Sequence, residues 1–140
     1  MTSPDTFDEA ARLRLALVRL TRTLRRSGTS KFSASQVSAL ATIEEYGPLR
    51  ISALAAHAAM DPSVATRVVA SLTTAQVLQR AEDPDDRRAC LVELSPQGRE
   101  ALAELWRERT LGLSERLERL EVSERQLIAA ALSVIEKLAR

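Results

Sequence analysis

Apolar residues recur at three- and four-residue spacing along most of the chain, which is the pattern of helices that bury one face. The first such stretch runs from Thr6 to about Ser27, and Gly28-Thr29-Ser30 then interrupts it. A long helix is predicted after Ser95-Pro96, and Ser123-Glu124-Arg125-Gln126 opens a last one. At about 1.5 Å per residue the long helix would span roughly 35 Å, which is more than a small domain needs to close its own core.

The middle of the chain begins with a helix that has clear start and stop signals. Ser33 and Gln36 form a capping-box pattern, in which the glutamine side chain reaches back to the serine amide. Apolar positions follow at helical spacing until Gly47-Pro48 ends the helix. The next three residues, Leu49-Arg50-Ile51, are short enough to form a stub of strand.

Two further helices follow directly. Ser52 can cap the first of them, which is expected to end near Met60. Asp61 can cap the second, with Pro62 at the first helical position, where its missing N–H costs nothing. This second helix is predicted to continue to about Ala75. The pattern therefore indicates a helix, a sharp turn and another helix.

A charged hairpin is predicted after these helices. Leu78 and Arg80 lead into a turn with a proline, three aspartates and two adjacent arginines. On the way out, Cys90, Val92 and Leu94 alternate with Leu91 and Glu93. Such a tip cannot bury itself, so it is either a solvated loop or a probe for an anionic partner. What precedes it in the chain decides between these interpretations.

Helix, turn, helix and hairpin in this order predict a winged helix-turn-helix, in a mostly α fold with a small β-hairpin wing. The first helix of the pair crosses the DNA backbone, and the second lies in the major groove with its N-terminal residues at the base edges. The candidate DNA contacts on the two helices are Ser52, Pro62, Ser63, Thr66 and Arg67. For Ser63 and Thr66 an alternative interpretation as helix caps stays open.

The stretch from Ile51 to Leu94 resembles the MarR family of transcriptional regulators, and the flanking helices fit as well. The resemblance rests on the turn Pro84-Asp85-Asp86-Arg87-Arg88-Ala89 and on the Leu-Ser-Pro-x-Gly that follows it. Asp-x-Arg alone is a weak pattern, but behind a helix-turn-helix it is specific. The resemblance implies that Arg88 enters the minor groove, that Asp86 holds Arg88 in position, and that Arg87 contacts a phosphate.

Two positions depart from the family pattern. Ala59 and Gln76 stand where family members often have glycine, near the helix–helix turn and after the second helix. Both turns must then form without the freedom of glycine at positive φ.

The chain is expected to form a two-fold dimer. Residues 1–32 and 96–140 are assigned as dimerisation helices, and residues 33–95 as the DNA-binding domain, because the terminal helices carry more apolar surface than the winged domain could cover. A dimer would set two recognition helices about one DNA turn apart, roughly 34 Å, so the expected target is a pseudo-palindromic duplex. The resemblance further implies a repressor that a small, often aromatic or anionic effector relieves by binding between the two regions.

Composition narrows the remaining possibilities. The 140 residues carry a formal net charge of +1, so DNA affinity must depend on a few placed arginines rather than on bulk charge. One cysteine and one histidine leave no disulfide, metal cluster or nucleophile–base pair, so we expect no enzyme, no metal and no cofactor. No apolar run approaches the roughly 20 residues that span a bilayer, so a soluble cytoplasmic protein is expected.

Three alternatives remain at this point. Cys90 is interpreted as a small buried hydrophobe, but a redox-responsive regulator that uses Cys90 is the alternative. His57 could act as a protonation switch. The winged helix could also bind a protein partner and leave its arginines without a role in DNA binding.

Overall fold

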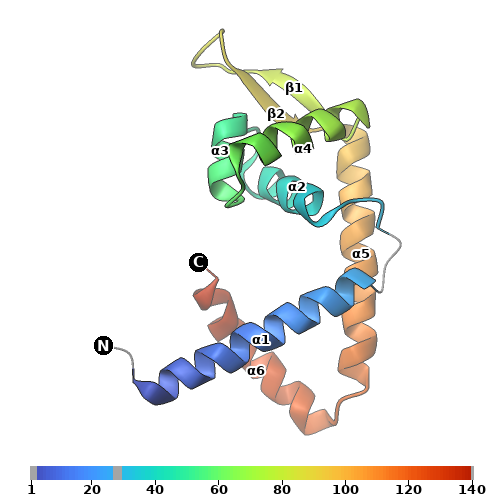
Figure 1. Cartoon of the computed structure of the whole chain (residues 1–140). Helices are drawn as coiled ribbons and strands as arrows, with labels where there is room; N and C mark the ends of the chain where they lie inside the picture. Colours follow the sequence, from blue (N-terminus) through green and yellow to red (C-terminus); the bar gives the residue numbers. More distant parts are fainter. Residues whose placement is uncertain (1–2, 27–29, 140) are drawn as a thin grey trace. The chain divides into compact units, whose positions relative to one another are not determined.

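The computed structural model describes residues 3–26 and 30–139, which form six helices and one antiparallel hairpin (Figure 1). The elements are α1 (Pro4–Arg26), α2 (Ala34–Tyr46), α3 (Ile51–His57), α4 (Pro62–Thr74), β1 (Leu78–Glu82), β2 (Cys90–Leu94), α5 (Pro96–Glu118) and α6 (Val122–Leu138). The fold is therefore mostly helical, as predicted. The expected helix end at Ser27 and the break at Gly28-Thr29 lie outside the described residues.

The chain divides into two compact units. One unit, called the winged unit below, contains α2, α3, α4, the hairpin and α5 as far as Trp106. The other contains α1, the remainder of α5 and α6. Residues 96–106, which the sequence assigned to the dimerisation helices, pack in the winged unit because the Leu102 and Leu105 side chains are buried in its core.

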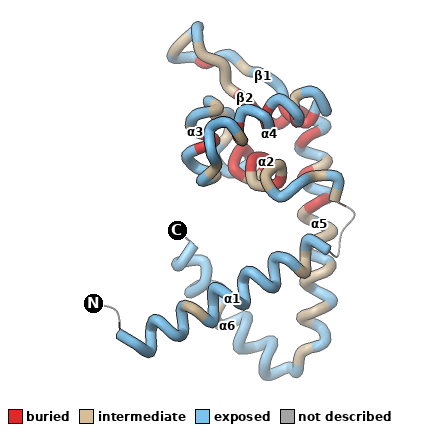
Figure 2. Tube along the Cα trace, in the orientation of Figure 1, coloured by how far each residue is buried: buried red, intermediate tan, exposed pale blue. Residues whose placement is uncertain are grey.

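The core of the winged unit takes side chains from every one of its elements. Figure 2 shows buried segments on α2, α4 and the first turns of α5, whereas α1 and α6 are exposed along most of their length. The largest fully buried side chains are those of Leu40, Leu54, Leu72, Leu78 and Leu102. These leucines hold three helices, the hairpin and the start of α5 together by apolar burial.

Most of the predicted helix signals are confirmed. Ser33 and Gln36 form the capping box, with the Gln36 amide donating to Ser33 Oγ at 3.2 Å and the Ser33 amide donating to Gln36 Oε1 at 2.8 Å. Gly47 ends α2 with φ +80°, a conformation that favours glycine. Asp61 caps α4 and accepts from the Ser63 amide at 2.9 Å, with Pro62 at the first helical position.

The predicted cap of α3 is wrong. The helix begins at Ile51 with Arg50 as its N-cap residue, and Ser52 lies inside the first turn. The reason is the pairing of Leu49 with Val92, whose two backbone hydrogen bonds of 3.0 and 2.8 Å keep the chain extended up to Arg50. The expected strand stub is therefore a single bridge at Leu49.

The predicted start of α6 is also displaced. The helix begins at Val122, and the capping box consists of Glu121 and Glu124 rather than starting at Ser123. The Glu121 amide donates to Glu124 Oε2 at 3.0 Å. A glutamate at the N-cap is less common than a serine, so Ser123 was the more obvious candidate in the sequence.

The Leu-Ser-Pro-x-Gly motif joins the hairpin to α5. Ser95 Oγ donates to the Gln76 carbonyl oxygen at 2.6 Å and accepts from the Gly98 amide at 2.9 Å. A Cβ atom at Gly98 would overlap the Val77 carbonyl oxygen, so this position requires glycine. The motif thus packs the first turn of α5 directly against the chain that leaves α4.

The two turns that lack glycine adopt the conformation that glycine favours. Ala59, between α3 and α4, has φ +48°, and Gln76, between α4 and β1, has φ +61°. Both turns therefore place a residue with a side chain in the left-handed region, which costs conformational free energy.

We expect Ala59→Gly to stabilise the protein by about 1 kcal/mol, because it relieves a left-handed alanine. The measurement is the free energy of unfolding from urea denaturation. As a control, Ala56→Gly on the exposed face of α3 should destabilise by about 1 kcal/mol, since Ala56 is helical. Equal destabilisation by both variants would contradict the assigned strain.

Candidate nucleic-acid interface

The N-terminal half of α4 presents the predicted groove contacts to solvent. Pro62, Ser63, Thr66 and Arg67 are all exposed, whereas the opposite face of the helix, with Val68 and its neighbours, is buried. The apolar spacing of α4 therefore orients these four residues away from the core. This is the orientation that a recognition helix requires.

Both hydroxyl groups on this face also have local partners. Ser63 Oγ donates to Asp61 Oδ1 at 2.6 Å, and Thr66 Oγ1 donates to the Pro62 carbonyl oxygen at 3.0 Å. The hydroxyl and backbone N–H of Ser63 hold the pKa of Asp61 below its usual value. Ser63 thus takes part in the cap, as its alternative interpretation predicts, and both hydroxyl oxygens keep lone pairs that can accept from a base.

The hairpin forms the predicted wing. Its ladder runs from Leu78 opposite Leu94 to Glu82 opposite Cys90. Leu78 and Leu94 are buried, so the base of the wing belongs to the core of the winged unit. The connecting turn, residues 83–89, extends beyond α3 and α4 (Figure 1).

An ion pair that no sequence signal predicts ties this wing to the start of α3. Arg50 Nε and Nη2 each lie 2.6 Å from Asp83 Oδ2, and the Asp83 side chain is only 6% exposed. The Asp85 amide donates to the other carboxylate oxygen, Oδ1, at 2.9 Å. This N–H and the Arg50 guanidinium lower the pKa of Asp83, and the hydrogen bond to Asp83 raises the pKa of Arg50.

Asp86 is placed to position Arg88, but it acts on the main chain. Its Oδ1 atom accepts from the Arg88 amide at 2.9 Å, and its Oδ2 atom lies 3.8 Å from Arg50 Nη2. The Arg87 and Arg88 side chains are exposed at the tip. Among the described residues, the ion pairs of the wing are those of Asp83 and Asp86 with Arg50.

The remaining candidates lie apart from these groups. Cys90 is half-buried at the start of β2, and its Sγ lies 3.4 Å from the Leu91 carbonyl oxygen. His57 is exposed and stacks on Tyr46, with ring centroids 4.1 Å apart. Within residues 3–26 and 30–139, no group of three or more His, Cys, Asp or Glu side chains could hold a metal ion, and no helix is long and apolar enough to cross a membrane.

Comparison with known proteins decides the family. The model of the MarR family matches residues 32–90, which include the recognition helix and the wing turn. The uncharacterized HTH-type transcriptional regulator Mb0904 of Mycobacterium bovis is 39% identical over 127 residues, which are 90% of this chain and 89% of that protein. The chain belongs to the MarR family.

Solved structures share its fold. A Pseudomonas aeruginosa protein assigned as a transcriptional regulator is 30% identical, with a TM-score of 0.83 and 99% of each chain covered. Bordetella bronchiseptica BpsR, whose DNA binding is regulated by 6-hydroxynicotinic acid, is 24% identical, with a TM-score of 0.67 and 95% of this chain and 99% of BpsR covered. As a MarR protein, the chain is a DNA-binding transcriptional regulator and not an enzyme, as its sequence predicted.

The buried Asp83 carboxylate gives this MarR protein an acid-sensitive wing. Its pKa is lowered in the folded state, so its contribution to stability is fully present above the ordinary value, about 3.9, and is lost as the pH falls through the lowered value. We therefore expect wild type to be more stable than Asp83→Asn above about pH 4, with the difference shrinking in stronger acid. The measurement is the free energy of unfolding of both proteins from urea denaturation across this pH range. A stability difference between them that does not depend on pH would contradict this role of Asp83.

Proposed function

We propose that this MarR-family regulator is a cytoplasmic homodimer that represses transcription at a pseudo-palindromic duplex. The helix face with Pro62, Ser63, Thr66 and Arg67 would enter the major groove, and Ser52, which is exposed in the first turn of α3, would approach the backbone. The observation that carries the proposal is the wing tip, where two exposed arginines follow a carboxylate that fixes the main chain.

The wing arginines suit DNA because their guanidinium groups are accessible and their main chain is held. A narrow minor groove concentrates negative potential, to which an inserted arginine responds. Arg88 is proposed to occupy this groove, and Arg87 is proposed to contact a phosphate. With a net charge of +1, the chain has no general attraction for polyanions that would replace these contacts.

The exposed apolar surface of α1 and α6 supports the dimer. Neither helix has a buried residue among those described, although Leu17 on α1 and Leu127 on α6 carry large apolar side chains that are 48% and 71% exposed. Monomeric proteins rarely expose contiguous apolar patches of this kind. A second copy of the chain would bury them, so α1, α6 and the part of α5 from Arg107 are proposed to supply the dimer contacts.

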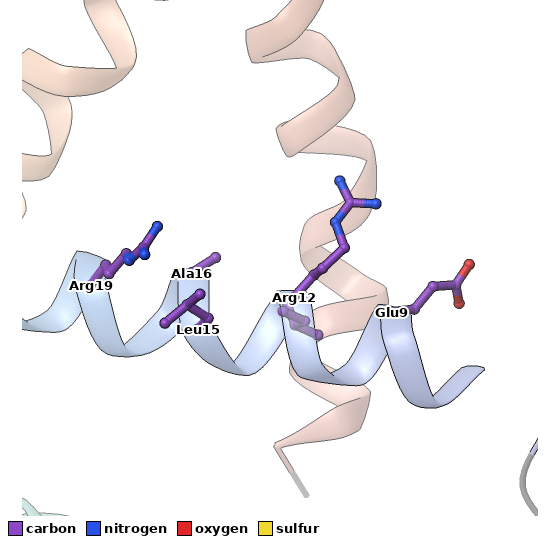
Figure 3. Close-up of a pocket in the computed structure, with 6 residues that line it drawn as sticks. Glu9, Arg12, Leu15, Ala16 and Arg19 are labelled. Carbon is purple, nitrogen blue, oxygen red and sulfur yellow. The ribbon is translucent and has the colours of Figure 1, made fainter. Parts of the chain in front are cut away.

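One stretch of α1 illustrates this unpartnered surface. A hollow of about 510 Å³ is lined by α1 alone, by Glu9, Arg12, Leu13, Leu15, Ala16 and Arg19 (Figure 3). The lining mixes leucines with charges of both signs. Because this hollow is open to solvent along α1, we propose that a helix of a second copy covers it.

Relief of repression by a small molecule is proposed by analogy. BpsR, which shares this fold, has its DNA binding regulated by 6-hydroxynicotinic acid. For this chain we propose an effector of the same broad kind, small and aromatic or anionic. It would act by favouring a dimer geometry that no longer matches successive major grooves.

We expect Arg88→Ala to weaken DNA binding about tenfold or more and to reduce the slope of log affinity against log salt by about 2, because each of the two protomers loses one charged contact. The probe is a duplex selected by the wild-type protein from a random-sequence library, and the measurement is a titration at several salt concentrations. Arg99→Ala, which removes an exposed charge from α5, is the matched control.

Unchanged affinity of Arg88→Ala would contradict the proposed wing contact. If no duplex were selected at all, the protein-interaction alternative would replace the proposal.

We expect Leu127→Glu to convert the dimer to a monomer in analytical ultracentrifugation, because the interface would bury an unpaired charge. Gln97→Glu, at an exposed position of α5 in the winged unit, is the control and should leave the dimer intact. A monomeric wild type, or a Leu127→Glu protein that remains dimeric, would contradict the proposed interface.

A further inference from the structure

Arg50 extends from a fixed point in the helix-turn-helix. The Leu49 amide and carbonyl pair with Val92 of β2, and the Arg50 carbonyl oxygen accepts from the Leu54 amide at 2.9 Å in the first turn of α3. The main chain on both sides of Arg50 is thus held by hydrogen bonds. The Cα atom of Arg50 is therefore fixed relative to both α3 and β2 of the hairpin.

The guanidinium reaches the turn of the wing, which folds around two carboxylates. Asp83 receives both short contacts from Arg50, and the Asp86 carboxylate lies 3.8 Å away. The Ala89 amide donates to the Asp86 carbonyl oxygen at 2.9 Å and closes the turn. Two carboxylates this close to one cation would repel each other without it, so Arg50 holds the turn together.

A continuous chain of contacts follows from these distances. Arg50 lies beside Asp86, and Asp86 accepts from the amide of Arg88. We propose that Arg50 is a positioning residue for DNA binding, which fixes the main chain of Arg88 by way of Asp83 and Asp86. This inference depends on the proposed function, because it assumes that Arg88 contacts DNA.

The physical gain is preorganisation. A loose turn would lose conformational freedom when Arg88 entered the groove, and that cost would reduce affinity. If Arg50 already fixes the turn in the free protein, most of this entropy cost is avoided on binding. The competing role for Arg50 is a direct contact with a DNA phosphate, since its side chain is 46% exposed and α3 is the helix that crosses the backbone.

The salt dependence of binding separates positioning from direct contact. We expect Arg50→Ala and Asp83→Asn each to weaken binding to the library-selected duplex about three- to thirtyfold, which is the usual range for a residue that acts through others. Neither variant should change the slope of log affinity against log salt, because no phosphate contact is removed. Arg99→Ala again controls for the loss of one exposed charge, and circular dichroism verifies that each variant is folded.

A double-mutant cycle tests the route through Arg88. If Arg50 acts by positioning Arg88, adding Arg50→Ala to Arg88→Ala should weaken binding far less than Arg50→Ala does in wild type. Arg50→Lys, which keeps the charge but loses the planar fork, should bind with intermediate affinity and guards against a folding defect in the alanine variant.

Two results would overturn the inference while leaving the proposed function intact. One is additive effects of Arg50→Ala and Arg88→Ala. The other is a salt slope reduced by about 2, one for each protomer, in Arg50→Ala, together with normal binding of Asp83→Asn, which would make Arg50 a phosphate contact. Normal binding by the Arg88→Ala single variant would instead remove the proposed wing contact, and this inference with it.

Discussion

The ion pair between Arg50 and Asp83 is the interaction on which the wing depends, because a two-stranded hairpin has little stability of its own in water. Buried leucines anchor the base of the hairpin in the core, but they lie at the end where β1 begins and β2 ends. The bridge between Leu49 and Val92 holds the middle of β2, but the ladder beyond it would be free to twist without a further attachment. Arg50 provides that attachment at the point where the turn leaves β1.

This arrangement makes sense of a nearly neutral regulator. Proteins that bind DNA through bulk charge can tolerate mobile side chains, since any cation near the phosphates contributes. A chain with a net charge of +1 must place a few cations accurately. Asp83 and Asp86 then have two effects: they hold the turn, and they offset the positive charge of Arg50, which would otherwise attract phosphates without specificity.

Much of this architecture could be predicted from local sequence signals. The capping box at Ser33, the Asp61-Pro62 start of α4 and the alternation in β2 each depend on neighbouring residues, and the structure confirms them. The starts of α3 and α6 differ from the prediction for two reasons, a contact with a distant part of the chain and an uncommon N-cap residue. Leu49 is drawn into a bridge with a strand far along the chain, and Glu121 replaces the expected serine.

The Arg50–Asp83 pair could not be predicted for a similar reason. The two residues are 33 positions apart, and the turn offers three aspartates as partners, so no spacing rule selects one. The family resemblance implies that Asp86 positions Arg88, but the hydrogen bond from the Arg88 amide to Asp86 depends on the fold of the turn. The sequence thus predicts which residues at the tip contact DNA, and the structure shows how the main chain of the tip is held.

In the proposed mechanism, Arg50 fixes the conformation of the wing before DNA binds, and the wing places Arg88 on DNA. A crystal structure of the protein with its selected duplex tests it most directly. The expected result is the Arg88 guanidinium in the minor groove, with Arg50 still paired with Asp83 and Asp86 still bound to the Arg88 amide. A complex in which Arg50 leaves Asp83 to contact a phosphate, or in which Arg88 stays in solvent, would contradict it.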